Sequence, residues 1–136
     1  MVRETVVTNR LKSFFKKNKS IEMAFLFGSV AEGRAIRESD VDVAVWFKGK
    51  YDLKTVNALE SEITSLLGRN VDLIVLNQAR PTIAWAAMRG IKLLIRNYPL
   101  FIRQMLAVSD EAEFMQDFVI DLFNQREKYR LGRAKA

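Results

Sequence analysis

The chain has 136 residues, of which 49% are hydrophobic and 28% are charged, and its formal net charge is +6. It contains no cysteine and no histidine, which excludes disulfides, Ser-His-Asp and Cys-His catalysis, and the usual zinc sites. Any acid–base or metal chemistry must therefore use carboxylates, lysine, tyrosine or hydroxyl groups, and the metal that suits oxygen ligands is a hard ion such as Mg²⁺.

The hydrophobic pattern predicts helices alternating with short strands. Apolar residues at helical spacing predict helices over residues 2–19, 53–67, 81–90 and 99–129, the last with a break at Ser109. Short apolar runs bounded by glycine or polar residues predict strands over residues 21–27, 41–47, 71–76 and 91–95. The polar residues 29–39 are expected to form a loop, or a short helix and a turn. This order predicts one sheet covered by helices, in a single domain spanning residues 1–136.

Basic residues gather near both ends of the sequence. The two groups are Lys12, Lys16, Lys17 and Lys19, and Arg126, Lys128, Arg130, Arg133 and Lys135. Runs of charge usually only solvate a helix face, but a basic surface also suits nucleotide phosphates, nucleic acid or an acidic partner. Since there is no aromatic-and-basic stacking platform and no helix-turn-helix pattern, direct nucleic-acid binding is not expected.

The sequence carries no sign of an export or membrane segment. Residues 1–10 are polar and lack the apolar core of a signal peptide. No uninterrupted apolar run approaches the ~20 residues that a membrane-spanning helix needs. We therefore expect a cytoplasmic protein that does not enter a membrane.

Gly28 and Ser29 follow directly after the predicted strand 21–27. Glycine allows a backbone to approach a ligand closely. If a short helix begins here, its free N–H groups and the Ser29 hydroxyl face the same space, an arrangement that suits the terminal phosphates of a nucleotide. Most Gly-Ser pairs, however, are plain turns.

Three aspartates lie in or beside predicted strands. Asp40 and Asp42 are two residues apart, so their carboxylates point to the same face of the strand. Two like charges this close repel each other, which a divalent cation would compensate. Asp42 also lies among apolar residues, where an unpaired carboxylate is costly. Asp72 completes a carboxylate cluster if its strand neighbours that of Asp42; the alternative is a structural ion pair with Arg69 or another base.

Together these features resemble the signature of the DNA polymerase β-like nucleotidyltransferase superfamily, which is Gly-Ser, ten residues and then Asp-x-Asp. The matching residues are Gly28, Ser29, Asp40 and Asp42 in the signature itself, with Gly33, Ser39 and Asp72 beside it. The resemblance covers roughly residues 10–95. The short chain is similar to the minimal nucleotidyltransferase group, the antitoxin partners of HEPN-type toxins.

The resemblance implies an α/β fold of the α+β type. Its core, at roughly residues 10–95, would be a mixed sheet of about four strands flanked by helices, followed by a C-terminal helical segment at roughly 99–131. The implied nucleotide-binding residues are Gly28, Ser29, Gly33 and Ser39. The implied catalytic and metal-binding residues are Asp40 and Asp42, which would bind two Mg²⁺ ions, and Asp72, the third carboxylate, which would assist the attacking hydroxyl.

Two positions depart from the family pattern. The residues two and four positions after Gly28 are often basic in relatives, but here they are Val30 and Glu32. Arg34 and Arg37 are the nearest candidates to supply the missing positive charge.

The expected function is transfer of AMP from ATP to a hydroxyl of a protein partner, as the antitoxin of a HEPN toxin. Nucleotidyl transfer rests on the carboxylates, and the protein target rests on the resemblance alone. One alternative is transfer to a small molecule such as an aminoglycoside, although such relatives usually carry an added helical domain for the acceptor. The other is a non-catalytic antitoxin that neutralises its partner by contact. Apolar residues that would supply such an interface, unless they form core, are Trp85, Met88, Phe101, Met105, Phe114, Met115 and Phe118.

Overall fold

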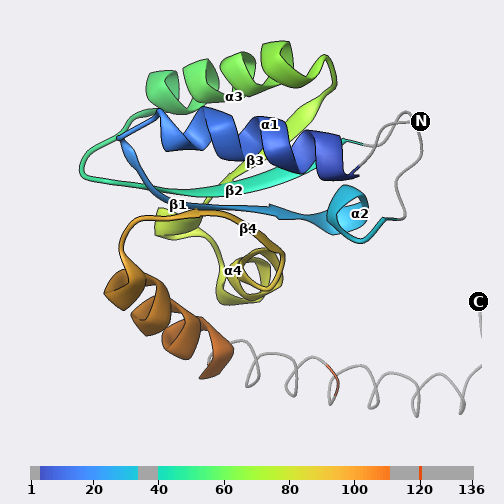
Figure 1. Cartoon of the computed structure of the whole chain (residues 1–136). Coiled ribbons are helices and arrows are strands. Elements are labelled where there is room, and N and C mark those ends of the chain that lie inside the picture. The colour runs from blue at the N-terminus through green and yellow to red at the C-terminus, as the bar shows by residue number, and fades with distance from the viewer. Residues whose placement is uncertain (1–3, 34–39, 111–119, 121–136) are drawn as a thin grey trace, which may run out of the picture.

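The computed structural model describes residues 4–33, 40–110 and 120, which form a sheet with helices on both faces (Figure 1). The elements in chain order are α1 (Glu4–Lys16), β1 (Ile21–Phe27), α2 (Gly28–Ala31), β2 (Val41–Phe47), α3 (Leu53–Leu67), β3 (Val71–Val75), the 3₁₀ helix η1 (Leu76–Gln78), α4 (Pro81–Met88) and β4 (Ile91–Ile95). Residues 98–110 form a further helix. Within these ranges no helix has the length and apolar character needed to cross a bilayer.

The sheet has four strands in the order β3-β2-β1-β4. Strand β1 pairs antiparallel with β2 and with β4, whereas β2 and β3 are parallel. The parallel pair requires a crossover between its strands, and α3 provides it. The predicted mixed sheet of the α+β type is therefore confirmed.

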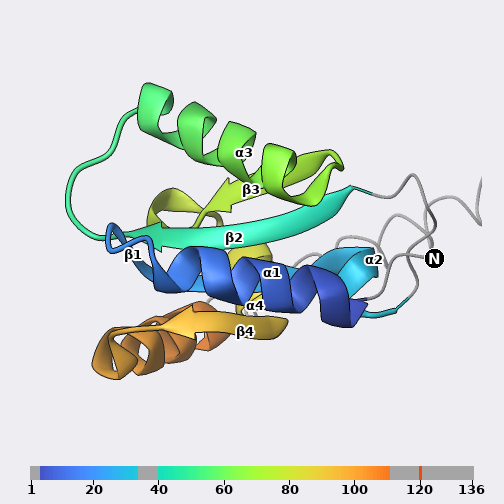
Figure 2. The ribbon, with the colours of Figure 1, turned by 45° about the horizontal axis from the view of Figure 1, so that its top comes forward.

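Alternation along β2 divides its side chains between two hydrophobic layers. Val41, Val43 and Val45 point into the core beneath α1 and α3, where all three are fully buried. Ala44 and Trp46 belong to a second cluster, which packs against α4 and the helix at 98–110. Figure 2 shows α1 and α3 lying along the strands on one face of the sheet, which we call the first face. Even-numbered positions of β2 therefore face the side of the sheet that carries α4.

Helix boundaries follow the expected local signals. Asp52 caps α3 by accepting a hydrogen bond from the Thr55 backbone N–H at 2.8 Å. Gly68 ends the same helix in the left-handed conformation, with φ 66°. Pro81 begins α4, where its missing N–H has no cost.

Two sequence expectations are corrected. The helix at 98–110 runs through Ser109, whose hydroxyl donates to the Leu106 carbonyl at 3.0 Å, so the predicted break at Ser109 is wrong. The hydroxyl is satisfied by the preceding turn and does not cap a new helix. Strand β3 ends at Val75, because η1 begins at Leu76.

Gly90 fixes the corner between α4 and β4 against β1. A Cβ atom at this position would lie 2.3 Å from the Leu26 carbonyl oxygen and 2.9 Å from the Phe27 Cβ. Leu26 is paired with Ile91 in the sheet, so its backbone is not free to withdraw. Only glycine fits this approach of helix to strand.

We expect Gly90→Ala to lower the free energy of unfolding by about 1–3 kcal/mol, because the added methyl group overpacks a backbone contact. Urea denaturation followed by circular dichroism measures the change. Ala86→Ser, on an exposed position of the same helix, is the matched control and should change stability by less than ~0.5 kcal/mol. Equal stability of the Gly90 variant and the wild type would contradict the tight corner.

Candidate functional site

The sheet gathers three aspartates at one end, on the face that carries α4. Asp42 in β2 lies directly opposite Asp72 in the parallel strand β3, and opposite Phe27 in β1. Asp40 immediately precedes β2, two residues from Asp42. The condition on which the sequence left the role of Asp72 open, that its strand neighbours that of Asp42, is met by this pairing. We call Asp40, Asp42 and Asp72 the aspartate cluster.

Asp42 is the half-buried member of this cluster, while Asp40 and Asp72 are exposed. Its partial burial raises the pKa of the Asp42 carboxyl above its ordinary value, and the negative charges of Asp72 and then of Asp40 raise it further. Burial is the largest of these three causes, and the two like charges add to it. The cluster is therefore a place where a cation would be stabilised.

The backbone of Gly28 lies against the Asp42 carboxylate. A Cβ atom on Gly28 would lie 2.1 Å from the Oδ2 atom of Asp42, and φ at this glycine is +79°. Two independent constraints, space and backbone conformation, therefore require glycine here. The half-buried Ser29 follows in the first turn of α2. The Gly-Ser pair and the aspartate cluster thus form one continuous surface.

The remaining predicted positions around α2 have different surroundings. Gly33 adopts φ +72°, and a Cβ atom added to it would meet no described atom within 4 Å, as expected of a turn. Val30 is only 3% exposed and packs in the core beneath α1 and α3, so it does not reach a ligand at the cluster. Glu32 caps the end of α2 and is exposed. Ser39, like Arg34 and Arg37, lies outside the described residues.

The carboxylates of the cluster fit an Mg²⁺ ion that is bound jointly by the protein and by a nucleotide. Among residues 4–33, 40–110 and 120, no three acidic side chains are arranged to enclose one ion by themselves. Mg²⁺ is usually bound through one or two carboxylates, with the remaining positions taken by waters and substrate phosphates. Adjacent carboxylates with a glycine backbone packed against them match this pattern better than a closed protein cage.

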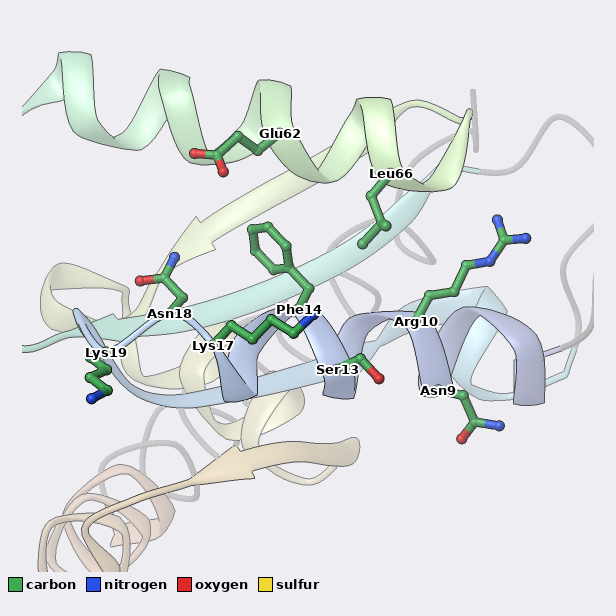
Figure 3. Close-up of a pocket in the computed structure, with 9 residues that line it drawn as sticks. All are labelled: Asn9, Arg10, Ser13, Phe14, Lys17, Asn18, Lys19, Glu62 and Leu66. Atoms are coloured by element: carbon green, nitrogen blue, oxygen red, sulfur yellow. The ribbon is translucent and has the colours of Figure 1, made fainter.

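The two described cavities lie away from the cluster. The larger, of about 710 Å³, is a groove between α1 and α3 on the opposite face of the sheet, lined by Asn9, Arg10, Ser13, Phe14, Lys17, Asn18, Lys19, Glu62 and Leu66. Figure 3 shows the charged ends of Arg10 and Lys19 turned toward opposite ends of α1. A smaller cavity of about 160 Å³ lies between α4 and the helix at 98–110. Because its cations do not converge, the groove offers no comparable chemistry, and the aspartate cluster is the stronger candidate site.

Sequence reasoning did not single out Phe27, the β1 neighbour of Asp42, or Gly90, which packs against Phe27. Phe27 is the cross-strand partner of Asp42, and its Cβ closely approaches Gly90. The only sequence signal is indirect: a glycine between a helix and a strand, and an aromatic residue at the last position of a strand.

Comparisons with known proteins agree with this geometry. The family model described as polymerase β, nucleotidyltransferase matches residues 9–99. No curated protein sequence matches the chain. Solved structures, by contrast, share the fold.

Three such structures illustrate the likeness. A toxin–antitoxin complex with AMP-PNP is 20% identical, with a TM-score of 0.73, covering 88% of this chain and 98% of that chain. An MNT antitoxin in complex with the tri-AMPylated HEPN toxin of Shewanella oneidensis is 17% identical, with a TM-score of 0.68, covering 91% and 98%. A minimal nucleotidyltransferase is 24% identical, with a TM-score of 0.58, covering 65% and 93%.

The raised pKa of Asp42 sets the sign of a pH dependence. Because its pKa is higher in the folded chain, the contribution of Asp42 to stability is fully present below the unfolded-state value of 3.8 and is lost as the pH rises through the folded-state pKa. We expect Asp42→Asn to be more stable than the wild type at neutral pH without divalent ions. The two should become equally stable below about pH 3.8, as measured by urea denaturation across that range.

Asp52→Asn is the control of opposite sign. Hydrogen bonds from Thr55 lower the pKa of Asp52, so its contribution to stability is present above 3.8 and is lost as the pH falls through the lowered value. Loss of stability at neutral pH in both variants would contradict the assignment of repulsion to the aspartate cluster.

Proposed function

Because the chain belongs to the polymerase β nucleotidyltransferase family, we propose that it transfers AMP from ATP to a hydroxyl group of a partner protein. The observation that carries this proposal is the register of β2 and β3, which sets Asp42 beside Asp72 while Gly28 lies against Asp42. Carboxylates with a glycine backbone packed against them suit a metal-bound triphosphate. We also propose that residues 1–136 form one domain. We propose that the protein is located in the cytoplasm, because ATP is available there.

In the proposed reaction the acceptor oxygen forms a bond to the α-phosphorus of ATP. The bond from that phosphorus to the bridging oxygen of the β-phosphate breaks, and pyrophosphate leaves. Asp40 and Asp42 would hold two Mg²⁺ ions, and Gly28 and Ser29 would hold the triphosphate through backbone N–H groups and a hydroxyl. When bound, the ions neutralise charge that develops on the phosphate oxygens.

Asp72 has a separate role in this proposal. It is exposed, and it lies beside Asp42 on the same face of the sheet. From this position its carboxylate accepts the proton that the attacking hydroxyl loses. Gly33 and Ser39 are proposed as further nucleotide-binding residues, and the positive φ of Gly33 provides the turn that follows α2.

We propose further that the partner is a HEPN-type toxin and that the chain is its antitoxin. Support comes from structures of the same fold that were solved with a toxin, one of them carrying AMP groups and another an ATP analogue. Those antitoxin chains are matched over 98% of their length, so this chain has nearly every element that they have.

Removing either proposed metal ligand should abolish transfer. Asp40→Ala and Asp42→Ala are each expected to reduce label transfer from radiolabelled ATP to a HEPN-type partner protein by at least ~100-fold, because each leaves developing charge uncompensated. Chelation of Mg²⁺ should have the same effect on the wild type. Asp52→Ala, a cap of α3, is the matched control and should retain transfer.

Persistence of full transfer in both cluster variants would refute the metal-ligand assignment. Absence of label with the wild type, despite a stable complex with the HEPN protein, would instead identify a non-catalytic antitoxin that acts by contact.

Asp72→Asn separates proton transfer from nucleotide binding. We expect kcat to fall by about 10²–10⁴, the usual contribution of a general base, while the affinity for Mg²⁺–ATP changes little. Steady-state kinetics and equilibrium binding of a fluorescent ATP analogue measure the two quantities. A loss of ATP affinity as large as that of Asp42→Ala would make Asp72 a metal ligand rather than a base. Asp110→Asn, on an exposed position of the last described helix, serves as the control.

A further inference from the structure

The helix at residues 98–110 exposes a line of large apolar side chains. Tyr98, Ile102 and Leu106 are 58%, 53% and 65% exposed. They recur every four residues, so they lie along one side of the helix. We call these three residues the apolar stripe. Figure 1 shows the helix (orange) on the outer side of the sheet face that carries α4.

The other side of the same helix is already used in folding. Leu100 is buried, and Phe101, Met105 and Val108 pack with it against the cluster beneath α4. Phe101 also stacks on Phe25 of β1, with ring centroids 5.9 Å apart. The helix thus packs on the sheet through this side. Tyr98 touches the edge of the contact through the Phe101 ring, with ring centroids 6.3 Å apart, while Ile102 and Leu106 remain more than half exposed.

This exposure is concentrated rather than scattered. Of the eight exposed large hydrophobic residues in the described ranges, three form the stripe and Ile120 follows them in sequence. The other four are distributed over three helices: Val6, Leu53, Leu66 and Ile83. Single exposed apolar residues are ordinary, whereas a contiguous line marks an interaction surface.

For three of the apolar residues considered as an interface, the structure supports the alternative that they form core. Met88 is buried, and Phe101 and Met105 pack against the core beneath α4, so these residues are not available to a partner. Phe114, Met115 and Phe118 lie outside the described residues. The available residues in this part of the chain are those of the stripe.

Matched lengths show which relatives share the segment that carries the stripe. The family model ends at residue 99, and the minimal nucleotidyltransferase covers 65% of this chain, about 88 residues. The antitoxin solved with its toxin and AMP-PNP covers 88%, about 120 residues. Even an alignment that starts at residue 1 would then extend about 20 residues past residue 99. Relatives seen with a partner therefore share the segment that carries the stripe.

We propose that the apolar stripe is the docking surface for the protein that accepts the nucleotidyl group, an inference that rests on the proposed function. The partner presents a complementary apolar helix face or groove. The stripe and the aspartate cluster belong to the same side of the sheet, the side that carries α4. Docking on the stripe tethers the acceptor to the face of the sheet that carries the site, which raises its effective concentration there.

Ile102→Glu and Leu106→Glu, singly and together, test this surface. We expect each to weaken binding of the full chain to a HEPN-type partner protein by about 30-fold, as for an interface hot spot. Isothermal titration calorimetry measures the affinity. Leu53→Glu is the matched control: Leu53 is 73% exposed on α3, on the opposite face, and its replacement should leave binding unchanged.

A second readout separates docking from chemistry. The double variant should show a raised KM for the partner, with an unchanged kcat at saturating partner and an unchanged affinity for Mg²⁺–ATP. Its thermal unfolding midpoint should stay close to that of Leu53→Glu, since all three positions are exposed.

Three outcomes would overturn the proposal. Unchanged partner affinity in the double variant, while Asp42→Ala abolishes transfer, would remove the stripe and leave the proposed function intact. Failure of the wild type to bind or label the HEPN protein would remove both. A wild-type dimer that Leu106→Glu converts to a monomer in sedimentation velocity, with partner binding retained, would assign the stripe to a second copy of the chain.

Discussion

The parallel pairing of β2 with β3 in a single register controls the chemistry of this protein. It places Asp42 opposite Asp72. Partial burial and the neighbouring negative charge both disfavour the ionised form of Asp42 and raise its pKa. What holds the register is the other face, where Val43 and Leu73 are buried beneath α1 and α3. A slip of one residue would turn the aspartates into that core. Hydrophobic packing on one side of the sheet therefore maintains a charged surface on the other.

The two faces of the sheet are filled to different extents. On the first face, α1 and α3 lie along the strands and cover the core. On the second, α4 and the helix at 98–110 pack against the central part, and Gly90 sets the position of α4 relative to β1. The end of β2 at Asp42 is covered only partly. Gly28 thus allows its backbone to lie against the Asp42 side chain, and Gly90 allows the corner between α4 and β4 to lie against β1.

Much of the fold was predictable from local patterns. The aspartate cluster was predictable because a carboxylate interrupts the apolar pattern of a strand. Strand runs, the Gly68 helix end and Pro81 carry strong local signals. Asp42 was recognisable because a carboxylate among aliphatic residues needs a reason. The contact of Gly28 with Asp42 was not predictable, because it depends on how β1 and β2 are aligned. Helical spacing also could not tell which side of residues 98–110 would face α4, since periodicity defines a line of residues but not its neighbour.

The strand order has a consequence for synthesis on the ribosome. Every member of the aspartate cluster, with Gly28, is made by residue 72, but β4 is among the last elements to emerge. Until then β1, which ends up inside the sheet, has a free edge of strongly apolar residues on its β4 side. Such an edge can recruit strands from other nascent chains. A chain shortened before residue 91 would contain the complete cluster and yet keep this edge permanently open.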